Sequence, residues 1–356
     1  MTLTLASVGS ADCLSAVTTH LSAFFDQKER SAAPYGRHFA QLWTAARVAT
    51  EGGKKIRPAL VVNTHRALAG SNDHDAIVVA TAFELLHTAF LLHDDVIDED
   101  TVRRGRPNLA GRFSEQASNR GVDEARATTW GQASAILAGD LLIHSAQNMV
   151  ARLNLPQQRR IALLDLLEES TFVTVAGELA DVAFSTNVAV PVLSQVLAMT
   201  QWKTAHYSFQ APLQAGAILA GASAETTSLL SEFGRLVGIA FQLRDDILGL
   251  FGTGQAIGKS VVSDLREGKL TPLMFHAQQI SSTNELRDII AQENITDADA
   301  ERVRHLVELS GARAFIENLT NDYAQAAVDV IQSAAIPATL RAQLRDVAQT
   351  ARDRTS

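Results

Sequence analysis

Cysteine is almost absent from this sequence, since Cys13 is the only one in 356 residues. A framework of intramolecular disulfides is therefore excluded, and a single thiol is typical of a protein in a reducing compartment. The stretch from Met1 to Ala16 lacks the basic segment of a secretory signal, and no uninterrupted apolar run has the length of a membrane span. We expect a cytoplasmic protein with no integral membrane segment.

Positive charge is scarce as well, because 31 Lys and Arg stand against 39 Asp and Glu, which gives a net charge of −8. This balance argues against a nucleic-acid partner and against binding to anionic lipid. Only six of the cations are lysines, so arginine serves as the general surface cation. We expect the lysines to stand where a compact ammonium group is needed.

Prolines and aromatic residues are few, at eight residues and 6%, in a chain that is 46% hydrophobic. This composition favours long helices around a large core, and we predict an all-α protein. We expect one domain over residues 1–356, with a variable helix and loop in 1–34, a motif-bearing bundle in 35–280 and C-terminal helices in 281–356. Within it, turn-forming and polar residues predict a loop at 29–34 and a mobile connection or lid at 112–129.

The most informative stretch covers residues 84–107. Placed on a helix, one stripe carries Glu84, His87, Asp94, Asp95 and Asp98, while the other faces are nearly all apolar. Burying unpaired carboxylates costs several kcal/mol each, so these side chains need cations. Carboxylates at positions i and i+4 can share Mg²⁺, which completes its shell with water and phosphate oxygens.

A solvated acidic end of a helix is the alternative interpretation of an isolated Asp-Asp-x-x-Asp pattern. The apolar helix before the pattern and Arg103 and Arg104 behind it favour a ligand site instead, because guanidinium groups suit phosphate oxygens. A diphosphate is therefore the ligand that we expect at such a site.

Two glycine-bearing segments carry most of the lysines. Gly-Gly-Lys-Lys-x-Arg-Pro at 52–58 opens a helix, where Lys54 and Arg57 would meet an anion, although an ordinary basic loop has the same composition. The second segment runs from Gly258-Lys259 to Lys269.

A second acidic motif holds Gln242, Asp245 and Asp246, and it follows Gly234 and Gly238, which permit close helix packing. The two acidic helix ends, each followed by a basic segment, would suit a shared cavity. Elsewhere, Glu178 and Asp181 either serve the same site or form a satisfied core network, and Lys203-Thr204 is a polar pair in a largely apolar helix.

Together these motifs resemble those of the trans-prenyltransferases, the head-to-tail polyprenyl diphosphate synthases. The resemblance covers roughly residues 35–280 with the motifs in the right order. The phrases Leu-Leu-His-Asp-Asp-Val-Ile-Asp and Asp-Leu-Arg-Glu-Gly-Lys look like bacterial geranylgeranyl diphosphate synthases of the actinobacterial kind.

The resemblance implies the isoprenoid synthase fold, an orthogonal helical bundle around a deep apolar cavity, and a homodimer. It implies Mg²⁺ as cofactor, with isopentenyl diphosphate and an allylic diphosphate (dimethylallyl, geranyl or farnesyl) as substrates. Asp94, Asp98 and Asp245 match the metal ligands, with Asp95 and Asp246 supporting them. The residues that match the isopentenyl diphosphate pocket are Lys54, Arg57, His87 and Arg104. The residues that match the allylic diphosphate site are Arg103, Lys203, Thr204, Gln242, Lys259 and Lys269.

Two positions depart from the family pattern. Gly249 stands where many relatives have a third aspartate, and Ser260 where many have proline. Because the ligand expected from the second motif is Asp245, we still expect activity. A class I terpene cyclase would not need an isopentenyl diphosphate pocket, and a non-catalytic regulatory subunit should have lost one of the aspartate pairs, both of which are present.

Product length depends on the residues one turn before Asp94, which would form the floor of the cavity. In the family that the chain resembles, an aromatic residue five positions before the first aspartate shortens the product. Here that position is Ala89, which argues against a strict fifteen-carbon limit, whereas the bulky Phe90 argues against a very long product. We predict geranylgeranyl diphosphate, with farnesyl or twenty-five-carbon and longer products as alternatives.

Overall fold

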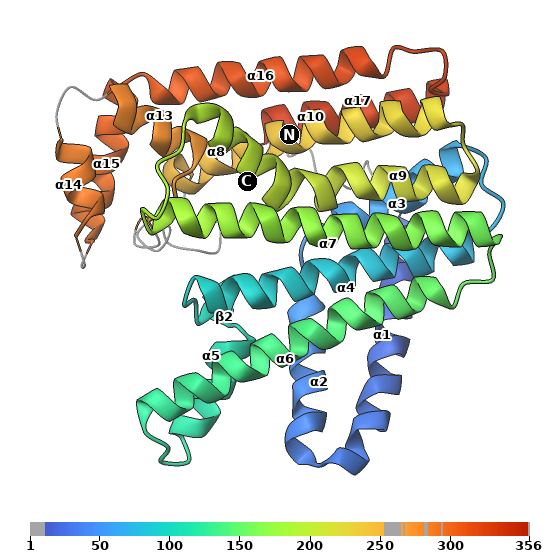
Figure 1. The fold of residues 1–356 in the computed structure, drawn as a ribbon, viewed down its shortest axis with the longest axis horizontal. Coiled ribbons are helices and arrows are strands. Elements are labelled where there is room, and N and C mark those ends of the chain that lie inside the picture. The colour runs from blue at the N-terminus through green and yellow to red at the C-terminus, as the bar shows by residue number, and fades with distance from the viewer. Residues whose placement is uncertain (1–10, 253–264, 266–267, 281–283, 293–294, 355–356) are drawn as a thin grey trace. The chain divides into compact units, whose positions relative to one another are not determined.

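The computed structural model describes residues 11–252, 265, 268–280, 284–292 and 295–354 (Figure 1). Nearly all regular structure in these ranges is helical, which confirms the predicted all-α class. The chain divides into two compact units. The N-terminal unit holds the described residues 11–165 together with 215–222, and the C-terminal unit holds 166–214 and the described residues from 223 to 354. The expectation of a single domain stays a prediction.

The N-terminal unit is built around one buried helix. Its elements are α1 (Ala11–Ala32), the 3₁₀ turn η2 (Ala33–Tyr35), α2 (Arg37–Thr50), α3 (Ile56–Ala67), α4 (Asp73–Ile97), β1 (Val102–Arg103), β2 (Arg106–Pro107), α5 (Leu109–Ser118) and α6 (Glu124–Ala151). Helix α4 packs against α6, α3 and α1, and Figure 1 shows α4 and α6 running side by side. Since α4 is apolar on nearly every face, contact with several helices is what its sequence requires.

Helix α4 has a well-defined start and an acidic end. The Asn72 side chain accepts a hydrogen bond from the His74 backbone N–H at 3.1 Å, and Asp73 and Asp75 lie in the first turn, where the helix dipole favours negative charge. Within the described part of the chain, only α4 is long and apolar enough to cross a membrane, and most of that stretch is buried inside the protein. Such burial is typical of a core helix.

Two loop predictions are wrong. Helix α1 extends to Ala32, so most of the expected 29–34 loop is helical and the chain reverses at η2. The expected mobile connection at 112–129 contains the end of α5 and the start of α6. There the Asn108 and Asp123 side chains cap α5 and α6. The polar residues that suggested a loop therefore belong to capped, amphipathic helices.

The C-terminal unit is centred on the helix that carries the second acidic motif. Its elements are most of α7 (Gln157–Ser185), α8 (Leu193–Thr200), the π-helix η3 (Gln201–Gln210), the start of α9 (Ala211–Ala220), α10 (Ala224–Phe251), α13 (Pro272–Ile280), α14 (Glu285–Ile290), α15 (Asp297–Leu309), α16 (Ala312–Val330) and α17 (Ala338–Asp353). Helix α10 packs against η3, α16 and α17 (Figure 1).

Glycines set the spacing between α10 and η3. A Cβ added at Gly238 would lie 2.6 Å from the Ala205 Cβ, and one added at Gly234 would lie 2.5 Å from the Gln210 Cα. On the α7 side, a Cβ at Gly177 would lie 2.3 Å from the backbone nitrogen of Lys203. The prediction that Gly234 and Gly238 permit close helix packing is therefore confirmed. The π-helix η3 therefore packs closely against α10 and α7 at these glycines. A π-helix often marks a functional site.

Candidate active site

The first acidic motif lies at the carboxyl end of α4. Asp94 and Asp95 are in its last turn, and Asp98 is the residue that caps the helix. The backbone then leaves the helix at Glu99, which has a left-handed φ of 57°. Because the carboxyl end of a helix is the negative end of its dipole, three carboxylates at this place are unfavourable without cations nearby.

Arg103 supplies the first of these cations. Its guanidinium binds Asp94 Oδ2 at 2.9 Å and Asp95 Oδ1 at 2.7 Å. The short β1–β2 hairpin positions it, since Arg104 and Gly105 adopt the positive φ values of 55° and 71° that the turn needs. Burial raises the pKa of Asp95 to about 6, although the Arg103 charge acts in the opposite direction. Arg103 therefore forms ion pairs with two of the three aspartates, Asp94 and Asp95.

The donor set fits a magnesium ion. A carboxylate oxygen of Asp94 lies within 4.8 Å of one from Asp98, both side chains are partly exposed, and they are hard oxygen donors. Mg²⁺ prefers such oxygens and keeps several waters, so a site open to solvent on one side suits it.

The basic loop before α3 lies beside the same hairpin. Arg104 donates a hydrogen bond from Nη1 to the Glu51 carbonyl at 2.9 Å. Its guanidinium also lies so close to the glycines that a Cβ added at Gly53, where φ is already +72°, would stand 2.9 Å from Nη2. Gly52 and Gly53 thus let Arg104 reach the loop that carries Lys54 and leads into the first turn of α3, where Arg57 lies.

His87 lies among these cations on α4, about two helical turns before Asp94. Burial, followed by the charges of Arg57, Arg103, Arg104 and Lys55, lowers the pKa of His87 well below its ordinary value. The imidazole is therefore neutral at neutral pH. Of the residues expected to bind isopentenyl diphosphate, Arg57 and Arg104 thus create a positive potential at His87, which is the environment that a diphosphate requires.

Lys55 has a role that the sequence did not reveal. It stands before α3 with a left-handed φ of 49°, and its Nζ binds Glu84 Oε1 at 2.6 Å and also donates to the Thr50 carbonyl. Glu84 is 5% exposed, so Lys55 compensates a buried charge. The neighbouring Lys54 is exposed. Of the two adjacent lysines, Lys55 pairs with a buried carboxylate, whereas Lys54 lies at the surface.

The second acidic motif lies on α10 in the C-terminal unit. Gln242 Nε2 donates to Asp246 Oδ1 at 2.9 Å, one turn further along the helix. Asp245 is partly exposed and binds Arg354 at 2.8 Å. No local motif in the sequence marks Arg354, which lies 109 positions from its partner.

Lys203 and Thr204 lie on the π-helix η3, and both are partly exposed. Lys203 Nζ binds Glu178 at 3.0 Å and Asp181 at 2.7 Å. The question left open by the sequence is thereby answered in part, since Glu178 and Asp181 form a network with a lysine of the predicted site.

The remaining expected cations lie in the segment before α13. Lys269 is partly buried and lies three positions before the start of α13. Lys259 lies outside the described residues.

The two adjacent lysines give a matched test of the Lys55–Glu84 pair. Lys55→Met should lower the free energy of unfolding by about 3 to 5 kcal/mol, because it leaves a buried carboxylate without its cation. Lys54→Met, at an exposed position, should change it by no more than about 0.5 kcal/mol. Urea unfolding at pH 7.5 measures both, and the double variant Lys55→Met with Glu84→Leu should recover most of the loss. Equal losses in the two single variants would contradict the assignment.

The comparisons with known proteins agree with these motifs. A model of the family described as Polyprenyl synthetase matches residues 41–309. The chain is 32% identical to a geranylgeranyl diphosphate synthase of Methanosarcina mazei, over 80% of this chain and 81% of that protein. It is 33% identical to a (2E,6E)-farnesyl diphosphate synthase of Mycobacterium bovis, over 85% of this chain and 80% of that protein.

Comparison with solved structures identifies the fold. A geranylgeranyl pyrophosphate synthase from Corynebacterium glutamicum, complexed with isoprenyl diphosphate and magnesium, matches with a TM-score of 0.88 at 27% identity, over 95% of this chain and 97% of that one. The isoprenoid synthase fold implied by the sequence is thereby confirmed. The chain belongs to the polyprenyl synthetase family and is a prenyltransferase, a head-to-tail polyprenyl diphosphate synthase.

Proposed function

We propose that this enzyme condenses isopentenyl diphosphate with an allylic diphosphate, in the presence of Mg²⁺, to give geranylgeranyl diphosphate. The observation that carries the proposal is the arrangement around His87. Cations from the loop before α3 and from the β1–β2 turn converge there, next to the acidic end of α4. A terpene cyclase has no need of a second diphosphate pocket, so this arrangement favours a condensing enzyme.

The proposed roles follow from the charges. Asp94, Asp98 and Asp245 would hold Mg²⁺, which when bound neutralises a leaving diphosphate and so stabilises the charge that develops on it. Arg103, Lys203, Thr204, Gln242, Lys259 and Lys269 would bind the allylic diphosphate. Lys54, Arg57, His87 and Arg104 would bind the diphosphate of isopentenyl diphosphate and orient its double bond. Fixed cations cost no reorganisation when the negative charge develops, which is why such sites accelerate ionisation.

Removal of one proposed ligand tests the metal site. Asp94→Asn should reduce kcat/KM by at least about a hundredfold at saturating Mg²⁺, because a ligand of the ion that stabilises the leaving group is lost. Glu99→Gln, one turn beyond at an exposed position, is the control and should keep near-normal activity. Thermal unfolding without metal shows whether the fold survives. Near-normal turnover of Asp94→Asn would mean that the assigned site is wrong.

Product length is set by local shape rather than by overall similarity, since relatives of nearly equal identity carry the names of geranylgeranyl and farnesyl diphosphate synthases. Ala89 is fully buried and Phe90 is partly exposed, and both lie little more than one helical turn before Asp94 on α4. One helical turn rises about 5.4 Å, close to the length of an isoprene unit. A small residue at 89 and a bulky one at 90 together support a twenty-carbon product.

Two reciprocal substitutions test this assignment. Phe90→Ala should lengthen the main product by at least one five-carbon unit, because it removes bulk from the proposed floor of the cavity. Ala89→Phe should shorten it by at least one unit for the opposite reason, although filling a buried position typically costs roughly 1 to 3 kcal/mol of stability. Mass spectrometry of the products from each allylic primer is the measurement. An unchanged product distribution in both variants would place the floor on another helix.

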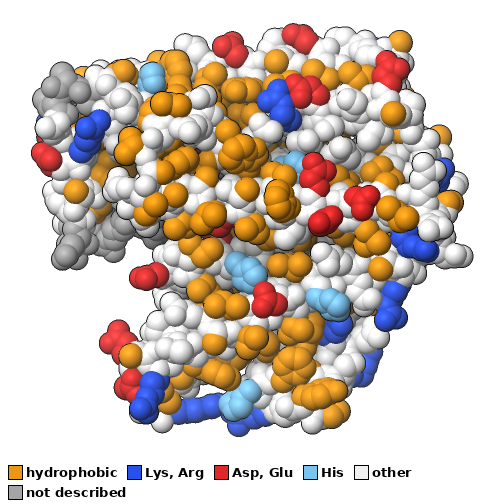
Figure 2. Space-filling model, viewed as in Figure 1, with side chains coloured by type: hydrophobic (Ala, Val, Ile, Leu, Met, Phe, Trp, Pro, Cys, Tyr) orange, Lys and Arg blue, Asp and Glu red, His pale blue; other side chains and the backbone are white. Residues whose placement is uncertain are grey.

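We also propose that the enzyme is a homodimer, and α7 offers a surface for it. Phe172, Val175 and Leu179 follow one another at helical spacing and are 76%, 57% and 69% exposed. Apolar side chains gather over the face along which α7 runs (Figure 2). A stripe of large apolar side chains in solvent is unfavourable for a monomer and is typical of an interaction surface.

Charge placed on this stripe should separate the dimer. The double variant Phe172→Glu with Leu179→Glu should sediment as a monomer at micromolar concentration, because two carboxylates would be buried without partners. Val190→Glu, at an apolar position that is 89% exposed beyond the end of α7, should leave the sedimentation coefficient unchanged. A wild-type chain that sediments as a monomer would refute the dimer.

A further inference from the structure

The residue that follows α17 is bound to the second acidic motif. Arg354 Nη1 lies 2.8 Å from Asp245 Oδ1, and the guanidinium carbon lies 4.9 Å from the centre of the Phe241 ring, one turn earlier on α10. The Arg354 side chain is 18% exposed. A guanidinium that is paired with a carboxylate and stacked on an aromatic face is held in a defined orientation.

The backbone of the same residue is fixed by α10 as well. Arg244 donates from Nε to the Arg354 carbonyl at 2.7 Å. Two adjacent residues of α10 therefore bind Arg354. Arg244 binds its main-chain carbonyl, and Asp245 binds its side chain. Helix α17 also packs along α10 and α16, which brings its end to this place.

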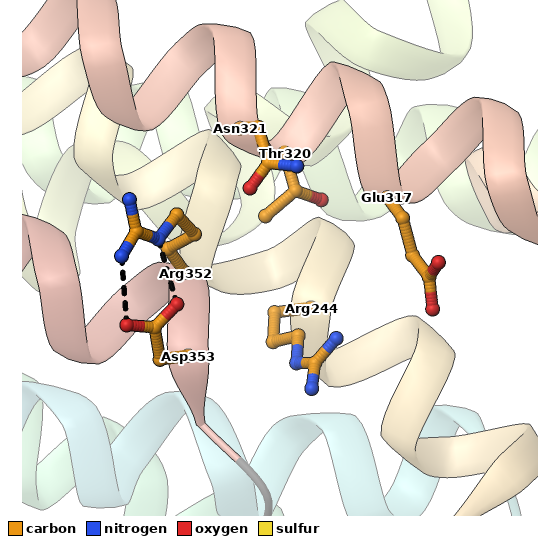
Figure 3. Close-up of a pocket in the computed structure, with 6 residues that line it drawn as sticks. All are labelled: Arg244, Glu317, Thr320, Asn321, Arg352 and Asp353. Carbon is orange, nitrogen blue, oxygen red and sulfur yellow. Dashed lines mark hydrogen bonds and ion pairs between the residues drawn. The ribbon is translucent and has the colours of Figure 1, made fainter.

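The end of α17 borders a polar pocket rather than an apolar core. The pocket has a volume of about 380 Å³ and is lined by Arg244, Glu317, Thr320, Asn321, Arg352 and Asp353. Figure 3 shows Arg352 turned onto its neighbour Asp353, at 2.6 and 2.8 Å, while Arg244 points into the pocket from α10. Arg352 and Asp353, the last two residues of α17, therefore line a polar pocket, whereas Ala351 before them is buried.

We propose that Arg354 is an internal counter-ion that occupies the Asp245 carboxylate when no divalent metal is bound and is displaced when the metal binds. This inference rests on the proposed function in one respect, the assignment of Asp245 as a metal ligand. The guanidinium and a metal ion would compete for the same carboxylate, so each must weaken the binding of the other by the same factor. Arg354 is therefore a regulatory residue that sets the metal concentration at which the second motif is occupied.

The size of the effect follows from exposure. Asp245 is 44% exposed, so its pair with Arg354 is screened by solvent. Exposed pairs of this kind change an equilibrium by about two- to fivefold. Loss of Arg354 should tighten the apparent affinity of the full-length protein for a divalent metal by that factor.

The test measures metal binding rather than turnover. Free Mn²⁺ is counted by electron paramagnetic resonance during titration of the full chain, with inorganic pyrophosphate present at a fixed concentration. Arg354→Gln should tighten Mn²⁺ binding about two- to fivefold, whereas Arg354→Lys, which retains a cation, should stay closer to the wild type. Arg352→Gln is the matched control, because Arg352 pairs with Asp353 and should leave Mn²⁺ binding unchanged.

Four results would overturn the proposal. Equal shifts in Arg354→Gln and Arg352→Gln would show a general effect of charge near α17. Weaker Mn²⁺ binding in Arg354→Gln would show that this arginine helps to bind pyrophosphate. If Asp245→Asn weakens Mn²⁺ binding while Arg354→Gln leaves it unchanged, only the counter-ion proposal is refuted, and Asp245 stays a metal ligand. Unchanged binding in Asp245→Asn would instead refute Asp245 as a ligand, and with it both proposals.

Discussion

The cost of holding carboxylates at the end of α4 is the constraint on which the N-terminal unit depends. Asp95 is 2% exposed and lies at the negative end of its helix, where both desolvation and the dipole oppose its charge. Arg103 offsets this cost, and it reaches the aspartates only because the β1–β2 turn follows directly. Lys55 does the same for Glu84 on an earlier turn of the helix. The polar stripe of α4 is thus held in place by cations from two separate connections.

The same arrangement recurs at three of the predicted ligand-binding residues. Asp94 is paired with Arg103, Asp245 with Arg354, and Lys203 with two acidic residues of α7. These charges are therefore compensated by other residues of the protein. A magnesium diphosphate carries both signs of charge, so its binding would exchange one set of partners for another rather than create bare charges. This exchange makes a charged site compatible with a stable fold.

The sequence was most informative where its pattern was local. Helical spacing predicted the stripe on α4, and the glycines of α10 predicted close packing, which the contacts of Gly234 and Gly238 confirm. It was wrong where local composition alone was used to place a loop. Polar residues at 112–129 suggested a loop, yet capped helices form there, because an amphipathic helix also needs a polar face. The π-helix η3 was not predictable, since its wider turn depends on how α7 and α10 pack against it.

The sequence by itself determined the reaction class and the spacing of the acidic motifs, because residues within one or two turns keep their neighbours whatever the rest of the chain does. Only the tertiary structure decided between the two adjacent lysines, where the left-handed backbone at Lys55 directs its ammonium group to Glu84. It also brought Arg354 to Asp245 from 109 residues away. Such contacts depend on which helices pack together, and that outcome is set by burial over the whole unit rather than by any local pattern.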